Sequence, residues 1–248
     1  HRAQLGGRGV AGQVLRGGVE GDVHAERERA LADGRGEGVV GHEDRPLAAR
    51  RISPHEALGV FVAFALAALC LVLQLNRFTQ LLSVIGCAIA VTYPFVKRFF
   101  ALPQFYLGAA FGWGVPMAFA AEFATVPKIG WLLFFAAILW AGVYDTLYAM
   151  VDRDDDLKIG VNSTAILFGD ADQFIIAVMQ LMVLFALYLA GKDAHLGLWY
   201  GLGLAAGGVF CLYQQILIRR REPEQCFRAF LNNNYFGMVI FIGLLLDY

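Results

Sequence analysis

Seven long apolar runs follow one another along the chain. They cover residues 55–74, 79–96, 103–121, 129–150, 173–190, 197–217 and 232–247. Each has about the ~20 residues that a helix needs to cross a bilayer core, the last run being short. None alternates with the period of two that a membrane strand requires. The pattern therefore predicts an all-α, polytopic membrane bundle with about seven transmembrane helices.

The composition agrees with a membrane protein. The 248 residues are 58% hydrophobic with a mean hydropathy of +0.56, whereas soluble domains are about 45–50% apolar. A formal net charge of −1 gives no reason to expect a nucleic-acid partner, and no protein partner is inferred. The four cysteines have no paired spacing, so we expect neither a disulfide nor a zinc site.

Basic residues gather in alternate loops between the runs. One set of loops holds Arg45, Arg50, Arg51, Lys97, Arg98, Arg153, Lys158, Arg219, Arg220, Arg221 and Arg228, and the other holds Arg77, Lys128 and Lys192. Cytoplasmic loops carry an excess of Lys and Arg. The first set is therefore expected on the cytoplasmic side of a bacterial inner membrane.

Five aspartates lie at the end of the fourth run. Asp145 is inside the run, and Asp152, Asp154, Asp155 and Asp156 follow it. A carboxylate in such a helix is costly and indicates a functional site. If the helix continues through the cluster, Asp145, Asp152 and Asp156 share roughly one face. Such a face favours Mg²⁺, which takes carboxylates together with substrate phosphates. The alternative is a solvated acidic turn.

The residues around this cluster carry a family resemblance. They read Y-D-T-x-Y-A-M-x-D-R-x-D-D-x-K-I-G over 144–160 and S-T-A-I-L-F-G over 163–169. This stretch resembles the second aspartate motif of the 4-hydroxybenzoate polyprenyltransferases, in the UbiA family of membrane prenyltransferases. The resemblance covers about residues 45–248 and includes Y-P-F-V-K-R at 93–98 and N-N-N-Y at 232–235.

The resemblance implies both an activity and a metal site. The activity is Mg²⁺-dependent transfer of a polyprenyl group from its diphosphate to 4-hydroxybenzoate, ortho to the hydroxyl, in ubiquinone synthesis. Asp152 and Asp156 are the expected Mg²⁺ ligands, with Asp155 as a further candidate. Asp145 is expected either as a ligand or beside one.

The resemblance also directs attention to basic residues near the motif. Lys158 and Lys97 are candidates for the leaving diphosphate, and Arg45 is expected in the same substrate site. Arg98 resembles the residue that lies near the benzoate carboxylate, which a guanidinium fork suits. The expected catalytic set is Asp152, Asp156, Arg98 and Lys158. Lys97 and Arg98 have an alternative explanation as ordinary residues of a positive-inside loop.

Several other polar side chains at the ends of the runs have more than one explanation. Tyr93 and Tyr148 are candidates to orient the phosphates or to shield an allylic cation with their π-faces. As tyrosines at helix ends, they are alternatively interface anchors. We interpret 232–234 as an N-cap cluster and His55 and His195 as interfacial residues.

The first 44 residues differ from the rest. They hold 11 of the 28 glycines and no aromatic residue, a composition that predicts disorder. The family's first motif, N-D-x-x-D-x-x-x-D, and two of its nine expected helices are not recognised here. The open explanations are an out-of-frame translation, a misjoined gene model and a divergent N-terminus. We expect little or no transferase activity from the chain as written, and rescue by an N-terminus that carries the motif.

Two alternatives to the favoured function stay open. One is a transporter or other non-catalytic membrane protein, although neither repeated halves nor paired broken helices are evident. The other is a UbiA-type transferase with a different aromatic acceptor. The prenyl chain length is not predicted.

Overall fold

The computed structural model describes residues 46–47, 50–96, 102–153 and 163–248, and all regular structure in these ranges is helical. The chain divides into two structural units, residues 1–68 and 69–248. The predicted disorder of residues 1–44 lies outside the described residues. So do six predicted site residues: Arg45, Lys97, Arg98, Asp155, Asp156 and Lys158.

Most of the first helix, α2 (Pro54–Val72), belongs to the first unit. Its start is defined by a capping box. The Ser53 hydroxyl accepts a hydrogen bond from the Glu56 backbone N–H at 3.2 Å, and the Glu56 carboxylate accepts one from the Ser53 N–H at 2.7 Å. This reciprocal pair satisfies two backbone donors that a helix start leaves free.

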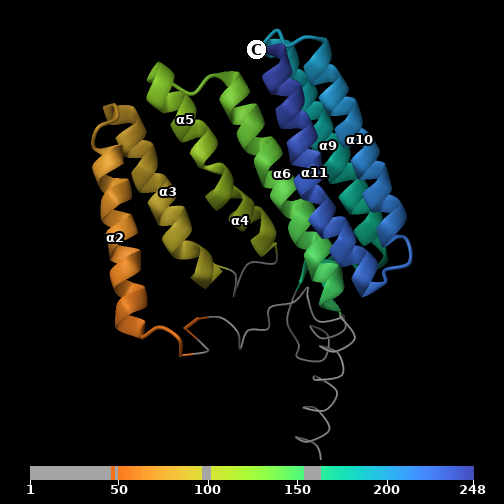
Figure 1. The fold of residues 1–248 in the computed structure, drawn as a ribbon, viewed down its shortest axis with the longest axis horizontal. Coiled ribbons are helices and arrows are strands. Elements are labelled where there is room, and N and C mark those ends of the chain that lie inside the picture. The colour runs from red at the N-terminus through yellow and green to blue at the C-terminus, as the bar shows by residue number, and fades with distance from the viewer. Residues whose placement is uncertain (1–45, 48–49, 97–101, 154–162) are drawn as a thin grey trace, which may run out of the picture. The chain divides into compact units, whose positions relative to one another are not determined.

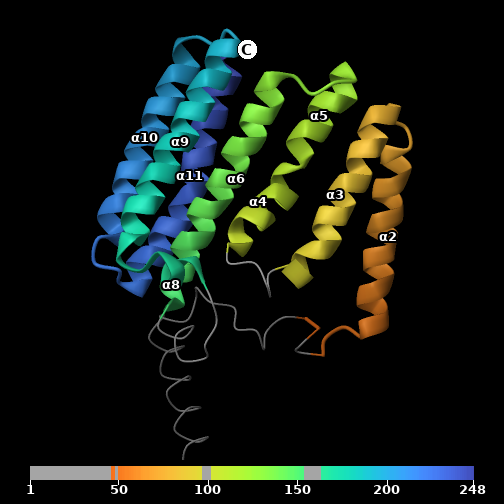
Figure 2. The ribbon, with the colours of Figure 1, turned by 180° about the vertical axis from the view of Figure 1, so that it is seen from behind.

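The second unit contains the other helices of the described residues. They are α3 (Arg77–Val96), α4 (Pro103–Gly112), α5 (Gly114–Phe123), α6 (Lys128–Val151), α8 (Thr164–Phe168), the 3₁₀ turn η2 (Gly169–Ala171), α9 (Asp172–Asp193), α10 (Leu198–Ile218) and α11 (Pro223–Asp247). In Figures 1 and 2 the long helices α9, α10 and α11 lie side by side, with α6 beside them. Because α6 contacts α4, α5, α9 and α11, it is the helix around which this unit packs.

The predicted transmembrane pattern is confirmed with one modification. By length and composition, six helices in the described ranges are able to cross a membrane: α2, α3, α6, α9 with the short turn before it, α10 and α11. The third predicted run instead folds as the pair α4 and α5, with Trp113 between them. Pro116 explains the break, because its nitrogen cannot donate to the carbonyl of Gly112.

The boundaries of two helices bear on the predicted site. α6 spans Lys128–Val151, close to the predicted run 129–150, and Asp152 has left the helical conformation (φ −91°, ψ 2°), so the condition that one helix continues from Asp145 through Asp152 is not met. The last helix begins at Pro223 and not at residue 232, so it has 25 residues. Its first two turns are polar, which hid them from an interpretation based on apolar runs.

Close packing of α10 on α11 depends on glycine. A Cβ atom on Gly203 would lie 2.7 Å from the carbonyl oxygen of Val239 and 3.2 Å from the Cα of Gly243, and these backbone atoms cannot move aside easily. Gly203→Val is therefore expected to destabilise the protein by about 1–3 kcal/mol. A thermal unfolding curve in detergent measures this. Gly201→Val is the matched control, since a Cβ there meets no atom within 4 Å. Equal unfolding temperatures for the two variants would contradict the packing account.

Candidate functional site

The C-terminal half of α6 brings together two of the predicted site residues. Asp145 is half-buried on α6, and it lies within electrostatic range of the phenols of Tyr93 on α3 and of Tyr144. Tyr93 stacks on Tyr106 of α4, with ring centroids 6.5 Å apart. The Tyr106 hydroxyl is 2.6 Å from the hydroxyl of Thr92. A carboxylate inside the span thus has phenols of α3 and α6 within electrostatic range.

Asp152 occupies a different position at the end of the same helix. It caps α6 and is partly exposed, about 10 Å further along the helix axis than Asp145 at ~1.5 Å per residue. The residues that the structure describes contain no group of three or more metal-binding side chains. The carboxylates of Asp145 and Asp152 nevertheless provide the hard oxygen ligands that Mg²⁺ takes. Mg²⁺ typically binds one or two such carboxylates together with phosphate. This chemistry fits the predicted metal.

An aromatic stripe follows α6 from the carboxylates into the membrane span. It consists of Trp140, Tyr144 and Tyr148, spaced four residues apart and therefore on one face. Tyr148, 37% exposed, meets the ring of Phe230 edge-on at 5.3 Å. Tyr144 meets the same ring at 6.3 Å, and Trp140 lies 6.0 Å from Phe236. The predicted residue Tyr148 is thus part of a continuous aromatic wall shared by α6 and α11.

This wall leads to an apolar cavity of about 310 Å³ between α5, α6, α9 and α11. Its lining residues are Val115, Leu133, Ala136, Ala137, Trp140, Val183, Leu187, Phe236, Gly237, Ile240, Phe241 and Leu244. Trp140 belongs to both the stripe and the cavity. It lies about 18 Å from Asp152 along the helix axis at ~1.5 Å per residue. Asp152 and the cavity are therefore at opposite ends of one aromatic path, and Asp145 lies between them along α6.

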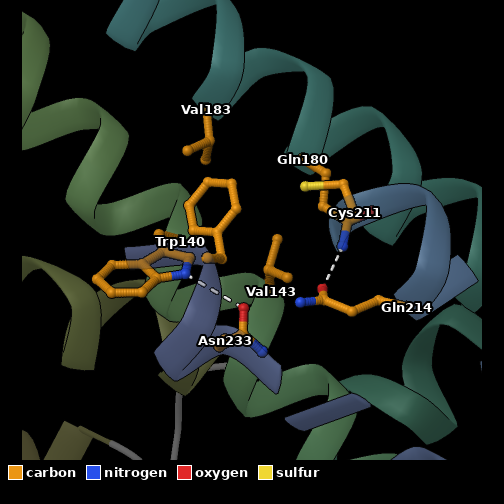
Figure 3. A pocket seen from close by; sticks show the side chains of 8 residues that line it. Trp140, Val143, Gln180, Val183, Cys211, Gln214 and Asn233 are labelled. Carbon is orange, nitrogen blue, oxygen red and sulfur yellow. Dashed lines mark hydrogen bonds between the residues drawn. The ribbon is translucent and has the colours of Figure 1, made fainter. Parts of the chain in front are cut away.

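Beside this cavity, buried amide side chains connect four helices. Figure 3 shows the Trp140 indole N–H donating to the side-chain oxygen of Asn233 at 3.2 Å and the Gln180 amide donating to Gln214 at 2.7 Å. The Gln214 amide donates in turn to Asn232 at 3.0 Å. Each buried amide thus finds on another helix the hydrogen-bond partner that lipid or apolar side chains cannot provide.

The interpretation of Asn232 to Asn234 as an N-cap cluster was therefore wrong. All three lie in the interior of α11, where Asn232 and Asn233 are buried and Asn234 is exposed. The amide of Asn233 also donates to the backbone carbonyls of Ala229 and Phe230, at 3.3 and 3.1 Å. Asn232 and Asn233 hold α11 against α10 and α6, and Asn233 fixes the indole that lines the cavity.

Two buried polar atoms near these elements have no hydrogen-bond partner among the described residues: the side-chain oxygen of Gln104 on α4 and the hydroxyl of Ser163. Ser163 directly follows residues 154–162. The next residue, Thr164, donates to the hydroxyl of Thr146 on α6 at 3.1 Å. Buried polar atoms are normally paired. The sequence analysis did not single out Gln104 as a buried polar residue. Its only signal there was an amide at the start of an apolar run.

A charged cluster joins the ends of α6, α9 and α10, and sequence reasoning did not identify its centre. Asp172 is fully buried and accepts hydrogen bonds from Arg153 and Arg221. We call these three residues the Asp172 cluster. Its carboxylate raises the pKa of the Arg221 guanidinium. Because the guanidinium is then even harder to deprotonate, Arg221 stays positively charged at neutral pH.

Comparisons with known proteins agree with the resemblance seen in the motifs. The profile of the UbiA prenyltransferase family matches residues 33–241, and so begins earlier than the motifs that carry the resemblance. A 4-hydroxybenzoate octaprenyltransferase from Alkalilimnicola ehrlichii is 57% identical over 203 residues, covering 82% of this chain and 69% of the relative. One from Methylococcus capsulatus is 49% identical over 227 residues, covering 92% and 73%.

Two solved structures share the fold. The apo structure of a UbiA homologue from Aeropyrum pernix K1 superimposes with a TM-score of 0.70 at 25% identity, covering 82% of this chain and 76% of that one. The structure of a digeranylgeranylglyceryl phosphate synthase gives a TM-score of 0.65 at 18% identity, covering 84% and 75%. At that identity the second comparison supports the architecture alone.

Proposed function

Because the chain belongs to the UbiA prenyltransferase family, we propose that it transfers a polyprenyl group from polyprenyl diphosphate to 4-hydroxybenzoate, as a step of ubiquinone synthesis. The observation that carries the choice of acceptor is the 57% identity over 203 residues to a 4-hydroxybenzoate octaprenyltransferase. In this reaction the bond between the allylic carbon and the diphosphate oxygen breaks, and diphosphate leaves with the electron pair. The ring carbon ortho to the hydroxyl bonds to the allylic carbon and then loses its proton.

The chain is an integral membrane protein, as the six long apolar helices in its described ranges and its family indicate. We place it in the bacterial inner membrane with the C-terminal end of α6 on the cytoplasmic side. The distribution of basic loop residues supports this orientation, since Arg153 and Arg219 to Arg221 belong to the richer set. The charged diphosphate group of the donor and the carboxylate of 4-hydroxybenzoate would then meet the protein at that face, where water reaches them.

The diphosphate end of the donor binds at the aspartate segment, residues 152–158. Asp152 and Asp156 would hold Mg²⁺ there, with Asp155 as a further ligand and Asp145 deeper in the span. When bound, Mg²⁺ neutralises negative charge that develops on the leaving diphosphate. Positive charge close to the same diphosphate oxygens would come from Lys158, Lys97 and Arg45.

The polyprenyl chain lies along α6 and in the apolar cavity. Support comes from the wholly apolar lining of the cavity and from the aromatic stripe between it and the aspartate segment. Tyr148 and Tyr144 present π-faces that stabilise positive charge on the allylic carbon and exclude water from it. Tyr93, within electrostatic range of Asp145, would orient the phosphates or shield the same cation. Arg98 binds the carboxylate of 4-hydroxybenzoate through a bidentate contact, which directs the ring toward the allylic carbon.

The proposed reaction is tested by a transfer assay with a panel of acceptors. The chain is produced in membranes as written and with an N-terminus that carries N-D-x-x-D-x-x-x-D. Both forms receive polyprenyl diphosphate and either 4-hydroxybenzoate, a naphthoate or a haem, and products are identified by mass spectrometry. We expect prenylated 4-hydroxybenzoate from at least one form, and that form is used for the kinetic comparisons below. Prenylation of another acceptor alone, or of none, would overturn the proposal.

The role of the apolar cavity makes a separate prediction. Gly237 lines the cavity, and a Cβ atom there would be 3.3 Å from the indole ring of Trp140. Gly237→Leu is expected to fill space that the polyprenyl chain uses and to raise its KM about tenfold, equivalent to ~1.4 kcal/mol. The KM for 4-hydroxybenzoate should not change.

Gly201→Leu serves as the matched control for this substitution, since a Cβ at Gly201 meets no atom within 4 Å. Initial rates at varied concentrations of each substrate provide both KM values. An equal increase in the two KM values, or no increase in either, would show that the chain does not lie in this cavity.

A further inference from the structure

The centre of the Asp172 cluster is a carboxylate with no exposed surface at the first residue of α9. The Arg221 Nε donates to both of its oxygens at 3.0 and 3.2 Å, and Nη2 donates to Oδ1 at 2.8 Å. The Arg153 Nη1 donates to Oδ2 at 3.4 Å, and the backbone N–H of Gln173 donates to Oδ1 at 2.7 Å. A buried carboxylate tolerates this position only while such donors surround it.

The turn between α10 and α11 is shaped to present Arg221 to this carboxylate. Arg221 has a backbone φ of 54°, in the left-handed region that side chains disfavour. Its Nη2 also donates to the carbonyl oxygen of Asp170 at 3.0 Å. The Gln173 amide reinforces the same junction by donating to the carbonyls of Ile218 and Arg219 at 3.1 and 3.3 Å. The start of α9 and the end of α10 are therefore held as one unit.

Arg153 connects the junction of α9 and α10 to the aspartate segment at Asp152. It directly follows Asp152, at the point where the backbone has left the helix. The Arg153 side chain is only 26% exposed and is held at Asp172. This contact restrains the backbone at the end of α6. Asp152 and Arg153 share one planar peptide unit, so this contact limits the backbone orientations from which the Asp152 carboxylate can reach a ligand.

We infer that Asp172 and Arg221 are positioning residues for the diphosphate–metal site: by holding Arg153, they set the orientation of Asp152. This inference rests on the proposed function, in which Asp152 is a metal ligand. Groups that orient ligands in this way typically change metal affinity about 10- to 100-fold when removed. A purely structural cluster would instead affect stability and leave metal affinity unchanged.

The test removes the contact to Arg153 while leaving the buried pair of Asp172 and Arg221 intact. Purified full chains, in the form that is active in the transfer assay and carrying Arg153→Gln, Arg153→Lys or neither, are titrated with Mn²⁺ in the presence of inorganic diphosphate. Bound Mn²⁺ is measured by electron paramagnetic resonance. Arg228→Gln is the matched control, because it breaks an exposed pair with Glu224 at the same end of the bundle (2.8 Å, Arg228 side chain 59% exposed). Unfolding temperatures are recorded for every chain.

We expect Arg153→Gln to weaken Mn²⁺–diphosphate binding about tenfold and Arg153→Lys to restore part of it, with unfolding temperatures close to that of the unsubstituted chain. Arg228→Gln should change neither quantity. Equal Mn²⁺ binding by the unsubstituted chain and Arg153→Gln would overturn the positioning role alone. Failure of the unsubstituted chain to bind Mn²⁺ with diphosphate would overturn the proposed function, and this inference with it.

Discussion

Replacing Asp152 by asparagine is expected to lower the rate of polyprenyl transfer at least about 100-fold, in the range found when one group that stabilises transition-state charge is removed. Asparagine keeps the shape of the side chain and loses its negative charge. Because the interaction with the metal–diphosphate is strongest when diphosphate leaves, the loss should appear in kcat more than in KM. Initial rates at saturating Mg²⁺ measure the effect.

The control for this substitution is Asp193→Asn. Asp193 is an exposed aspartate at the last residue of α9, so it undergoes the same chemical change far from the aspartate segment. Helical content from circular dichroism should be equal for the two variants and the unsubstituted protein. Full activity of Asp152→Asn at saturating Mg²⁺ would remove Asp152 from the site and leave the solvated acidic turn as its explanation.

Replacing Arg98 by alanine is expected to raise the KM for 4-hydroxybenzoate by roughly 30-fold, which corresponds to ~2 kcal/mol for a lost charge-assisted contact. The KM for polyprenyl diphosphate should change little, since the proposed contact is to the benzoate carboxylate. Substrate analogues without the carboxylate should bind equally well to both proteins.

Arg219→Ala controls for the removal of a basic loop residue, because Arg219 is an exposed arginine that follows α10. Equal increases in both KM values for Arg98→Ala would assign Arg98 to the diphosphate. Identical kinetics for Arg98→Ala and Arg219→Ala would leave Arg98 as an ordinary residue of a positive-inside loop.

Hydropathy predicted the helices well because long apolar segments have few alternatives in a membrane. It predicted their ends less well where polar residues interrupt an apolar run. The segment from Pro223 to Leu231 is an example: its charged residues break the run, yet Cys226 and Ala229 are buried in α11. The interruption at Trp113 was also missed, although Pro116 was its visible signal.

The roles of the candidate site residues stay predictions. The motifs pointed to Asp145, Asp152, Tyr93 and Tyr148, of which Asp145 and Tyr93 lie within electrostatic range of one another. The sequence motifs did not identify Asp172, because a single aspartate at the start of an apolar run is a common helix-start residue. Nor did they identify Gln180 and Gln214, although an amide inside a membrane span requires a partner. These partners lie on other helices, and one sequence alone does not pair them.

The most direct test of the proposed metal–diphosphate site is binding of a radiolabelled polyprenyl diphosphate to the purified chain with Mg²⁺ and with a chelator. The site as proposed predicts saturable binding that requires Mg²⁺ and that Asp152→Asn weakens at least about tenfold, as expected for loss of a metal ligand. Binding of equal affinity with and without Mg²⁺, unaffected by Asp152→Asn, would contradict a metal–diphosphate site at the end of α6.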